Sequence, residues 1–402
     1  MTGLLDDIKV VDLAGPAITY TGRMLVDLGA DVVLVEPPDG SRSRLLAPVA
    51  TVASGVTISA HFAYMAAGKR SVTLDLTSAV AAPTLERMLE WADVVLVTPD
   101  DSDPLPAGLD LEAWSEAHPR LVVTVVTPFG LRGPRRTWHG SDLTGWAAGG
   151  VLPFVGDADR PPLSPAGGLA YATASTNAAM ATMLALRTRT STGRGQLIDI
   201  SVQEAVMSVA LEAGPYMVME TVSIPYERTG MRRSTPPIGQ YRTKDGAVSI
   251  VGYMPGQWDA LASWIAEETG NDAITLDTFG GTPAARSPYV EAIDAWIEEL
   301  TTRYTKQDFF EEAQRRGIPV GPVNSIADLV ADPHLEATEA WRFVEDPEIG
   351  TIRYPRPPIR VDGDAGDVGR IPSVGQHTDE VLRDALGMTP IEIAGLRASG
   401  TI

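Results

Sequence analysis

Cysteine is absent from this chain of 402 residues. Without cysteine the chain forms no disulfide, has no thiolate nucleophile and offers no cysteine ligand to a metal. Histidine is also scarce. The five histidines show no H-x-x-x-H or similar ligand spacing, so we expect no metal site.

Positive charge is in short supply as well. The chain has 32 Lys and Arg against 52 Asp and Glu, a formal net charge of −20. This balance argues against nucleic acid or an anionic membrane surface as a partner. A ligand that carries phosphate would need cations gathered at one place. The N-terminal sequence MTGLLDDIKV is acidic and unlike a secretory signal, so we expect a cytoplasmic protein.

One uncharged run, residues 163–186, is long enough to span a bilayer. The run is rich in Gly, Ala, Ser and Thr and lacks the Leu, Ile and Phe density of a membrane helix. It therefore predicts a helix of small residues that is buried on all sides. Such burial would require a partner surface.

The chain opens with a strand–turn–helix–strand pattern. Ile8–Leu13 is an apolar run, helical spacing follows as far as Gly29, and Val32–Val35 is a second β-branched run. This βαβ unit predicts a parallel sheet with a ligand at the Ala14–Tyr20 turn, outside the carboxyl end of the first strand. The turn lacks G-x-G-x-x-G, which disfavours a dinucleotide whose ribose is held by Glu36.

Further apolar runs continue the pattern. Ser71–Leu76, Val94–Val97 and Leu121–Val126 each follow a helix-sized gap, which predicts a doubly wound α/β fold. From 142 to 220 we expect helices without strands. Tyr241–Val251 then predicts a hairpin that begins a smaller domain.

Seven segments resemble the family III CoA-transferases, which include formyl-CoA transferase, carnitine CoA-transferase and α-methylacyl-CoA racemase. In chain order they are VDLGADVVLVEPP, AGKRSVTLDL, HPRLVVTVVTPFGLRGP, TGRGQLIDIS, YRTKDG, RGIPVGPVNSIADLVADPHL and GQHTDEVLRDALG. They run in family order from about residue 8 to residue 402.

The resemblance implies an α/β fold with a Rossmann-like, doubly wound large domain, an inserted small α/β domain and an interlocked homodimer. We expect residues 1–222 to form the N-terminal part of the large domain, 223–325 the linker and small domain, and 326–402 the segment that completes the large domain. The implied substrate is an acyl-CoA thioester, so coenzyme A is the expected ligand.

Cations near two strand ends suit the phosphates of CoA. Lys69 and Arg70 lie where the family places a contact to the nucleotide end, and the resemblance places the Phe129–Gly130 turn near the thioester. The alternative is that these cations are solvated surface side chains. The predicted CoA-binding residues are Ala17, Ile18, Arg42, Arg44, Lys69, Arg70, Phe129, Gly130 and Arg132.

The catalytic carboxylate of the family is missing from its usual place. In the transferases an aspartate ahead of T-G-R-G-Q attacks the acyl-CoA carbonyl, and here that place holds Tyr171. No Asp or Glu occurs between Asp159 and Asp199. The racemases place a histidine directly before an aspartate where this chain has Ser141 and Asp142, and His139 lies two residues early.

Three hypotheses remain for the function. The chain is an acyl-CoA enzyme, of transferase type or of isomerase, racemase or dehydratase type, with Tyr171, Asp142 and His139 as catalytic candidates. Alternatively it is a non-catalytic subunit that forms a heteromer with an aspartate-bearing paralogue. As a third possibility, it uses its cleft for a small molecule other than CoA.

Overall fold

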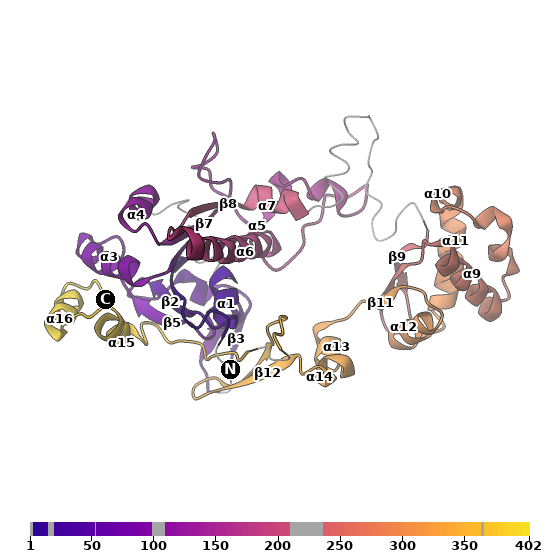
Figure 1. Ribbon diagram of the computed structural model, residues 1–402. Helices are drawn as coiled ribbons and strands as arrows, with labels where there is room; N and C mark the ends of the chain where they lie inside the picture. The colour runs from indigo at the N-terminus through magenta and orange to yellow at the C-terminus, as the bar shows by residue number, and fades with distance from the viewer. Residues whose placement is uncertain (1–2, 15–19, 53, 99–108, 210–235, 363–365) are drawn as a thin grey trace. The chain divides into compact units, whose positions relative to one another are not determined.

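The computed structural model describes residues 3–14, 20–52, 54–98, 109–209, 236–362 and 366–402 (Figure 1). By its internal contacts the chain divides into two units. The large unit comprises Met1–Val151, Ser164–Val222 and Leu335–Ile402, and the small unit comprises Leu152–Leu163 and Ser223–His334.

A six-stranded sheet forms the centre of the large unit, in the order β5-β2-β1-β6-β7-β8. All neighbouring strands in it run parallel, as the opening βαβ unit predicts. The strands are β1 (Lys9–Ala14), β2 (Asp31–Glu36), β5 (Arg70–Thr73), β6 (Val94–Thr98), β7 (Val122–Thr127) and β8 (Leu197–Ser201). A short hairpin of β3 (Val49–Thr51) and β4 (Thr57–Ser59) lies outside this sheet.

The strand order reverses between β1 and β6. From β1 the chain proceeds through β2 to β5 on one side, and from β6 through β7 to β8 on the other. Ala14 pairs with Thr98 at the carboxyl ends of these two strands. A crevice outside the carboxyl ends at such a reversal is the usual ligand site of an open α/β sheet.

Helices cover both faces of the sheet. Val10, Val32 and Val94 face α1 (Tyr20–Asp27) and α6 (Leu169–Thr192) in one apolar cluster. The residues next to them, such as Val11 and Val33, face α3 (Ala82–Trp91), α4 (Leu111–Ala117) and α16 (Pro390–Ala398). Alternate strand residues thus enter two different cores, which is why these strands are almost wholly apolar.

One expectation for the middle of the chain was wrong. Strands do not stop after residue 142, because β8 joins the sheet as an edge strand beside β7. Burial of α6 on all sides, which would require a partner surface, stays a prediction: within one chain Met180 is 52% exposed and Leu184 is 60% exposed. Its buried side carries mostly Ala, Ser and Thr, which lets the helix lie close to the sheet.

Shorter helices connect these elements. The large unit also contains α2 (Ala60–Ala66), α5 (Asp142–Ala148), α7 (Val202–Val209) and α15 (Thr378–Glu380), the last followed by a π-helical turn (Val381–Ala385). A hairpin of β12 (Trp341–Asp346) and β13 (Gly350–Pro355) precedes the C-terminal helices.

The C-terminal segment is attached to the edge of the sheet at β5. The backbone N–H of His377 donates to Ser71 O at 2.9 Å, and Ser71 N–H donates to His377 Nδ1 at 3.1 Å. Thr73 N–H donates to the Thr378 hydroxyl at 3.0 Å. Residues about three hundred positions apart in sequence therefore close one unit.

This attachment predicts a loss of stability in acid. Burial lowers the pKa of His377 from 6.5, and Arg70 lowers it further against the opposite effect of Glu380. Since the folded-state pKa lies below the unfolded one, the stabilisation is fully present above pH 6.5 and is lost as pH falls through the folded-state pKa.

We expect the melting temperature to fall more steeply between pH 7 and pH 5 in the wild type than in His377→Asn. The Asn amide oxygen offers Ser71 N–H an acceptor that does not titrate. Equal slopes in the two proteins would contradict this role for His377.

The small unit has its own sheet and core. Its strands pair antiparallel in the order β11-β10-β9, and Trp258, Trp264 and Phe309 are fully buried in its apolar cluster. The elements are β9 (Ile238–Arg242), β10 (Ala247–Val251), α9 (Pro255–Thr269), α10 (Pro283–Arg286), α11 (Val290–Thr301), α12 (Lys306–Arg315), β11 (Val320–Pro322) and α13 (Ile326–Val330). The chain then continues through α14 (Pro333–Ala337).

Candidate active site

The turn after β7 holds two of the predicted CoA-binding residues, Phe129 and Gly130. Gly130 has a φ of +83°, which only glycine adopts readily. The ring of Phe129 meets Trp138 edge-on, with centroids 6.2 Å apart. Gly140 packs on the same turn, because a β-carbon built on it would come within 2.5 Å of Pro128 Cβ. The loop thus returns to its start and brings α5 to the carboxyl end of β7.

Asp142 and Tyr171, both predicted as catalytic, meet at the start of α6. The residue before this helix is Gly168, which has no side chain to cap it. Asp142 caps the helix from α5 instead: its Oδ1 accepts hydrogen bonds from Ala170 N–H at 2.8 Å and Tyr171 N–H at 3.3 Å. A carboxylate is favourable at a helix N-terminus. The other oxygen, Oδ2, accepts no hydrogen bond from the residues that the structure describes.

Tyr171 is buried, and its hydroxyl donates to Gly140 O at 3.3 Å. The Tyr171 hydroxyl is therefore held by the backbone two residues ahead of Asp142. Two nearby buried donors, Thr127 Oγ1 and Trp146 Nε1, have no hydrogen-bond partner in the described part of the chain. Such groups require a ligand or a water molecule as partner.

His139 and Arg132 are exposed on the loop between β7 and α5. Across the described residues, no hydrogen bond joins His139 to Asp142 or Tyr171. The third predicted catalytic residue is therefore close in sequence to this pair without being part of its hydrogen-bond network. Contacts of Arg132 with CoA stay a prediction.

Lys69 is a buried side chain and not a surface cation. Its Nζ lies 2.8 Å from Asp12 Oδ2, and both side chains are fully shielded from solvent. Burial lowers the pKa of Lys69, while the charge of Asp12 raises it, and the net shift is downward. Gly22 in α1 lies against the pair, since a β-carbon there would come within 2.4 Å of Asp12 Oδ2. The pair thus joins β1 to the residue that precedes β5, and α1 packs against it at Gly22.

Arg44 forms a second internal ion pair, with Glu36 at the end of β2. Its Nε and Nη2 each donate to a Glu36 oxygen at 2.7 Å, and the guanidinium lies 4.1 Å over the Phe62 ring. Burial raises the pKa of Glu36, but the bonds from Arg44, Ser71 and Ser41 outweigh it and leave the pKa lowered. Glu36 therefore anchors the following loop, and both of its carboxylate oxygens already accept hydrogen bonds from within the chain.

Arg70 also pairs within the chain. It donates to both oxygens of Asp31, at 2.9 and 2.6 Å, and to Glu380 at 3.2 Å. Arg42 is exposed in a short 3₁₀ helix (Arg42–Leu45). The remaining predicted contacts, Ala17 and Ile18, lie outside the described residues.

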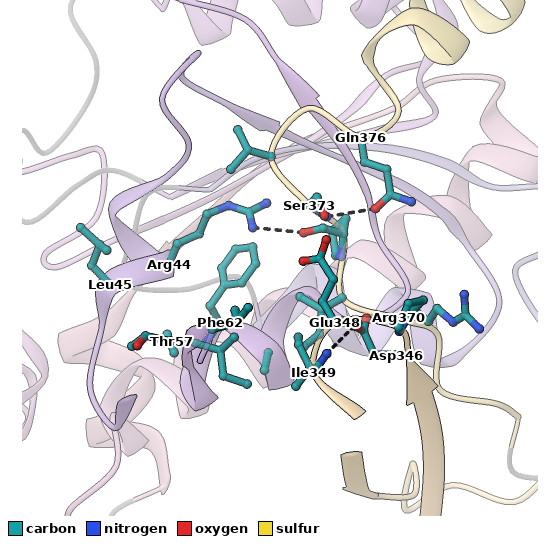
Figure 2. A pocket seen from close by; sticks show the side chains of 18 residues that line it. Arg44, Leu45, Thr57, Phe62, Asp346, Glu348, Ile349, Arg370, Ser373 and Gln376 are labelled. Atoms are coloured by element: carbon teal, nitrogen blue, oxygen red, sulfur yellow. Dashed lines mark hydrogen bonds between the residues drawn. The ribbon is translucent and has the colours of Figure 1, made fainter. Parts of the chain in front are cut away.

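A pocket of about 540 Å³ opens beside Arg44 (Figure 2). Arg44 and Phe62 line one wall, and the tip of the β12–β13 hairpin with Glu348 lines another. The volume falls in the range of small-molecule sites, about 300–1,000 Å³. Of the described cations predicted to bind CoA, Arg44 lines this pocket, whereas Lys69 and Arg70 do not.

Two acidic residues in this region were missed by sequence reasoning. Asp12 is the partner of Lys69. The sequence feature that could have revealed it is a charged residue inside an apolar strand, because a buried charge requires a partner. Asp199 in β8 accepts the Leu131 N–H with both oxygens, each at 3.0 Å. The sequence gives little indication of this role for Asp199, because acidic residues are common in exposed edge strands.

Neither a metal site nor a membrane span is found in the described segments. Among these residues, no group of three or more His, Asp or Glu side chains is placed to hold a metal ion. Likewise, none of the described helices has the length and apolarity needed to cross a bilayer.

The sequence profile of CoA-transferase family III matches residues 5–378. A succinyl-CoA–D-citramalate CoA-transferase from Chloroflexus aurantiacus is 29% identical over 418 residues, covering 99% of this chain and 98% of that protein. A succinyl-CoA:(R)-benzylsuccinate CoA-transferase subunit BbsE from Thauera aromatica is 31% identical over 405 residues, covering 98% and 97%.

A solved structure is also similar throughout. It is a CAIB/BAIF family protein from Brucella suis, with a TM-score of 0.81 and 29% identity, covering 96% of this chain and 100% of that one. These similarities confirm the predicted family resemblance and the α/β fold with a parallel central sheet.

Proposed function

We propose a function for this chain on the basis of its family, since it belongs to CoA-transferase family III. It binds an acyl-CoA thioester and takes part in the transfer of CoA from that thioester to a carboxylic acid. The family match over residues 5–378 carries this proposal. The two relatives named above both use succinyl-CoA by name, so the proposed acyl group is that of a small dicarboxylic acid.

Transfer through an anhydride needs a carboxylate that attacks the thioester carbonyl. Tyr171 is a poor substitute, because a phenol has an unperturbed pKa of about 10 and is mostly protonated at neutral pH. Its hydroxyl is also engaged with Gly140 O. The chain therefore lacks the nucleophile at the place where the family resemblance puts it.

This feature favours a more specific proposal, that the chain is the non-catalytic subunit of a heteromeric CoA-transferase whose aspartate is supplied by a paralogue. The relative from Thauera aromatica is itself named as a subunit. Affinity purification of the tagged chain from its source cells should then copurify a second family III chain. Recovery of a homomer alone would contradict the heteromer.

A second candidate is proton transfer at the acyl chain. Asp142 has an oxygen, Oδ2, with no hydrogen-bond donor among the described residues, so it is placed to act as a base. Tyr171 would then give its hydroxyl proton to a hydrogen bond with the thioester carbonyl in place of Gly140 O. Exchange of the acyl α-proton in heavy water, abolished in Asp142→Asn, would favour this candidate.

Binding of the thioester is the first test of the proposal. We expect calorimetry with succinyl-CoA to give a Kd of about 1 μM to 1 mM, the usual range of KM values for enzyme substrates. Pantetheine, which lacks the nucleotide and its phosphates, is the control and should bind at least about tenfold more weakly, since each charge-assisted hydrogen bond to phosphate contributes about 1.5–3 kcal/mol. Absence of binding by both CoA and succinyl-CoA would overturn the proposed function.

A further inference from the structure

Asp199 holds the turn that follows the neighbouring strand. It lies in the edge strand β8, in register with Val125 of β7. Both of its carboxylate oxygens lie 3.0 Å from Leu131 N, so a single N–H is shared between them. A hydrogen bond to a charged acceptor is stronger than one between neutral groups. One side chain of β8 thus fixes the chain four residues after β7 ends.

The turn between Pro128 and Leu131 is attached at both ends. At its start, Pro128 O accepts the Gln203 N–H at 3.1 Å. Gly130 reverses the backbone with its positive φ, and a β-carbon on it would lie 3.6 Å from Asp199 Oδ1. At its end, the Leu131 N–H is held by Asp199. The carboxylate therefore stands beside the residue whose conformation sets the direction of the turn.

The same turn supports the Asp142–Tyr171 pair. Gly140 packs on Pro128, and Gly140 O accepts the hydroxyl of Tyr171. A shift of the turn would therefore change the place of Phe129, of Gly140 and of the phenol together. Asp199 is exposed and touches neither Asp142 nor Tyr171 within the described part of the chain, so it acts on this site through the turn.

We infer that Asp199 is a positioning residue for acyl-CoA binding: it holds the Phe129–Gly130 turn in the orientation that the ligand meets. The inference rests on the proposed function, because it takes the ligand to be an acyl-CoA. Nothing in the residue's own chemistry suggests a direct contact. CoA is strongly anionic, and a second anion would repel it.

The negative charge of Asp199 lets the direction of the change in CoA affinity distinguish two roles for this residue. If Asp199 were only a surface carboxylate, its removal from a chain of net charge −20 would leave the affinity for CoA unchanged or increase it. If Asp199 positions the turn, its removal weakens binding although a repulsive charge is lost. Asn retains an oxygen that accepts the Leu131 N–H, so the amide variant separates the acceptor from the charge.

The experiment is calorimetry of the full chain with CoA for the wild type, Asp199→Ala and Asp199→Asn. We expect Asp199→Ala to weaken binding by more than about tenfold and Asp199→Asn to stay within about threefold of the wild type. Glu112→Ala is the matched control. Glu112 is an exposed acid in α4, beside the shallow depression that Leu131 and Leu197 line, and its loss should not weaken binding.

Limited digestion with trypsin gives a readout that does not depend on the ligand. Arg132, Arg135 and Arg136 are exposed directly after the turn, and cleavage there should be faster in Asp199→Ala than in the wild type or Asp199→Asn. This readout stays informative even where the alanine variant is less stable, because its melting temperature is measured alongside.

The two proposals fail in different ways. Wild-type protein that binds neither CoA nor succinyl-CoA would overturn the proposed function. Wild-type protein that binds CoA while Asp199→Ala binds it equally well or more tightly, with unchanged cleavage, would overturn the role of Asp199 alone.

Discussion

Replacing Tyr171 by aspartate should give this chain, by itself, a CoA-transferase activity that we expect the wild type alone to lack. The new carboxylate would stand in the first turn of α6, where the helix dipole favours its charged and nucleophilic form. Asp142 is close to this position through its bond to Tyr171 N–H, and like charges raise the pKa of one partner. At neutral pH the pair still supplies an ionised carboxylate.

The expected gain is at least about a hundredfold in the rate at which CoA passes from succinyl-CoA to an acceptor acid, forming succinate and the new acyl-CoA, or about 2.7 kcal/mol of barrier. Tyr171→Asn is the matched control, because it leaves the same cavity and lacks the nucleophilic carboxylate. Truncation of a buried aromatic side chain costs about 3–5 kcal/mol of stability, so both variants are compared at a temperature where both are folded. A rate in Tyr171→Asp no higher than in Tyr171→Asn would contradict the assignment of position 171.

Replacing Lys69 by methionine should destabilise the protein strongly. The ammonium of Lys69 is paired with Asp12 where neither side chain meets solvent. Removing one partner of a buried ion pair leaves an uncompensated charge, at a cost of about 3–5 kcal/mol in the free energy of unfolding. Denaturant unfolding followed by circular dichroism measures the difference.

Arg70→Met is the control for this change, because Arg70 is the next residue and its ion pairs are partly exposed. Its loss should cost about 0–1 kcal/mol. The double variant Asp12→Leu/Lys69→Met removes both charges of this pair, so much of the lost stability should return. Equal stability of Lys69→Met and Arg70→Met would show that the Asp12–Lys69 pair is not the anchor described above.

The strands of the sheet were largely predictable because they are buried on both faces. The runs at Val94–Val97 and Leu121–Val126 are apolar without interruption, and the structure shows them as β6 and β7 almost residue for residue. β8 was missed because it is an edge strand with alternating exposed and half-buried residues, among them Asp199. Its sequence, LIDIS, is short and combines apolar with polar residues, so it does not predict a strand unless its pairing with β7 is known.

The roles of the charged residues were less predictable, because they depend on partners far away in sequence. Lys69 follows a glycine in a typical loop sequence, and only the fold places Asp12 beside it, 57 positions earlier. Arg44 similarly pairs with Glu36 and also donates to Pro372 O, 328 positions away. In contrast, Asp142 and Tyr171, which are in contact in the structure, were both predicted from the sequence as catalytic candidates.

We propose that this chain takes part in acyl-CoA chemistry without forming an acyl anhydride on itself. The direct measurement is incubation of the purified wild-type chain with succinyl-CoA and hydroxylamine, which intercepts such an anhydride, while CoA release and the mass of the protein are followed. We expect CoA release at the rate of the protein-free blank and an unmodified protein mass. Rapid CoA release with a hydroxamate formed on a residue of this chain would contradict it.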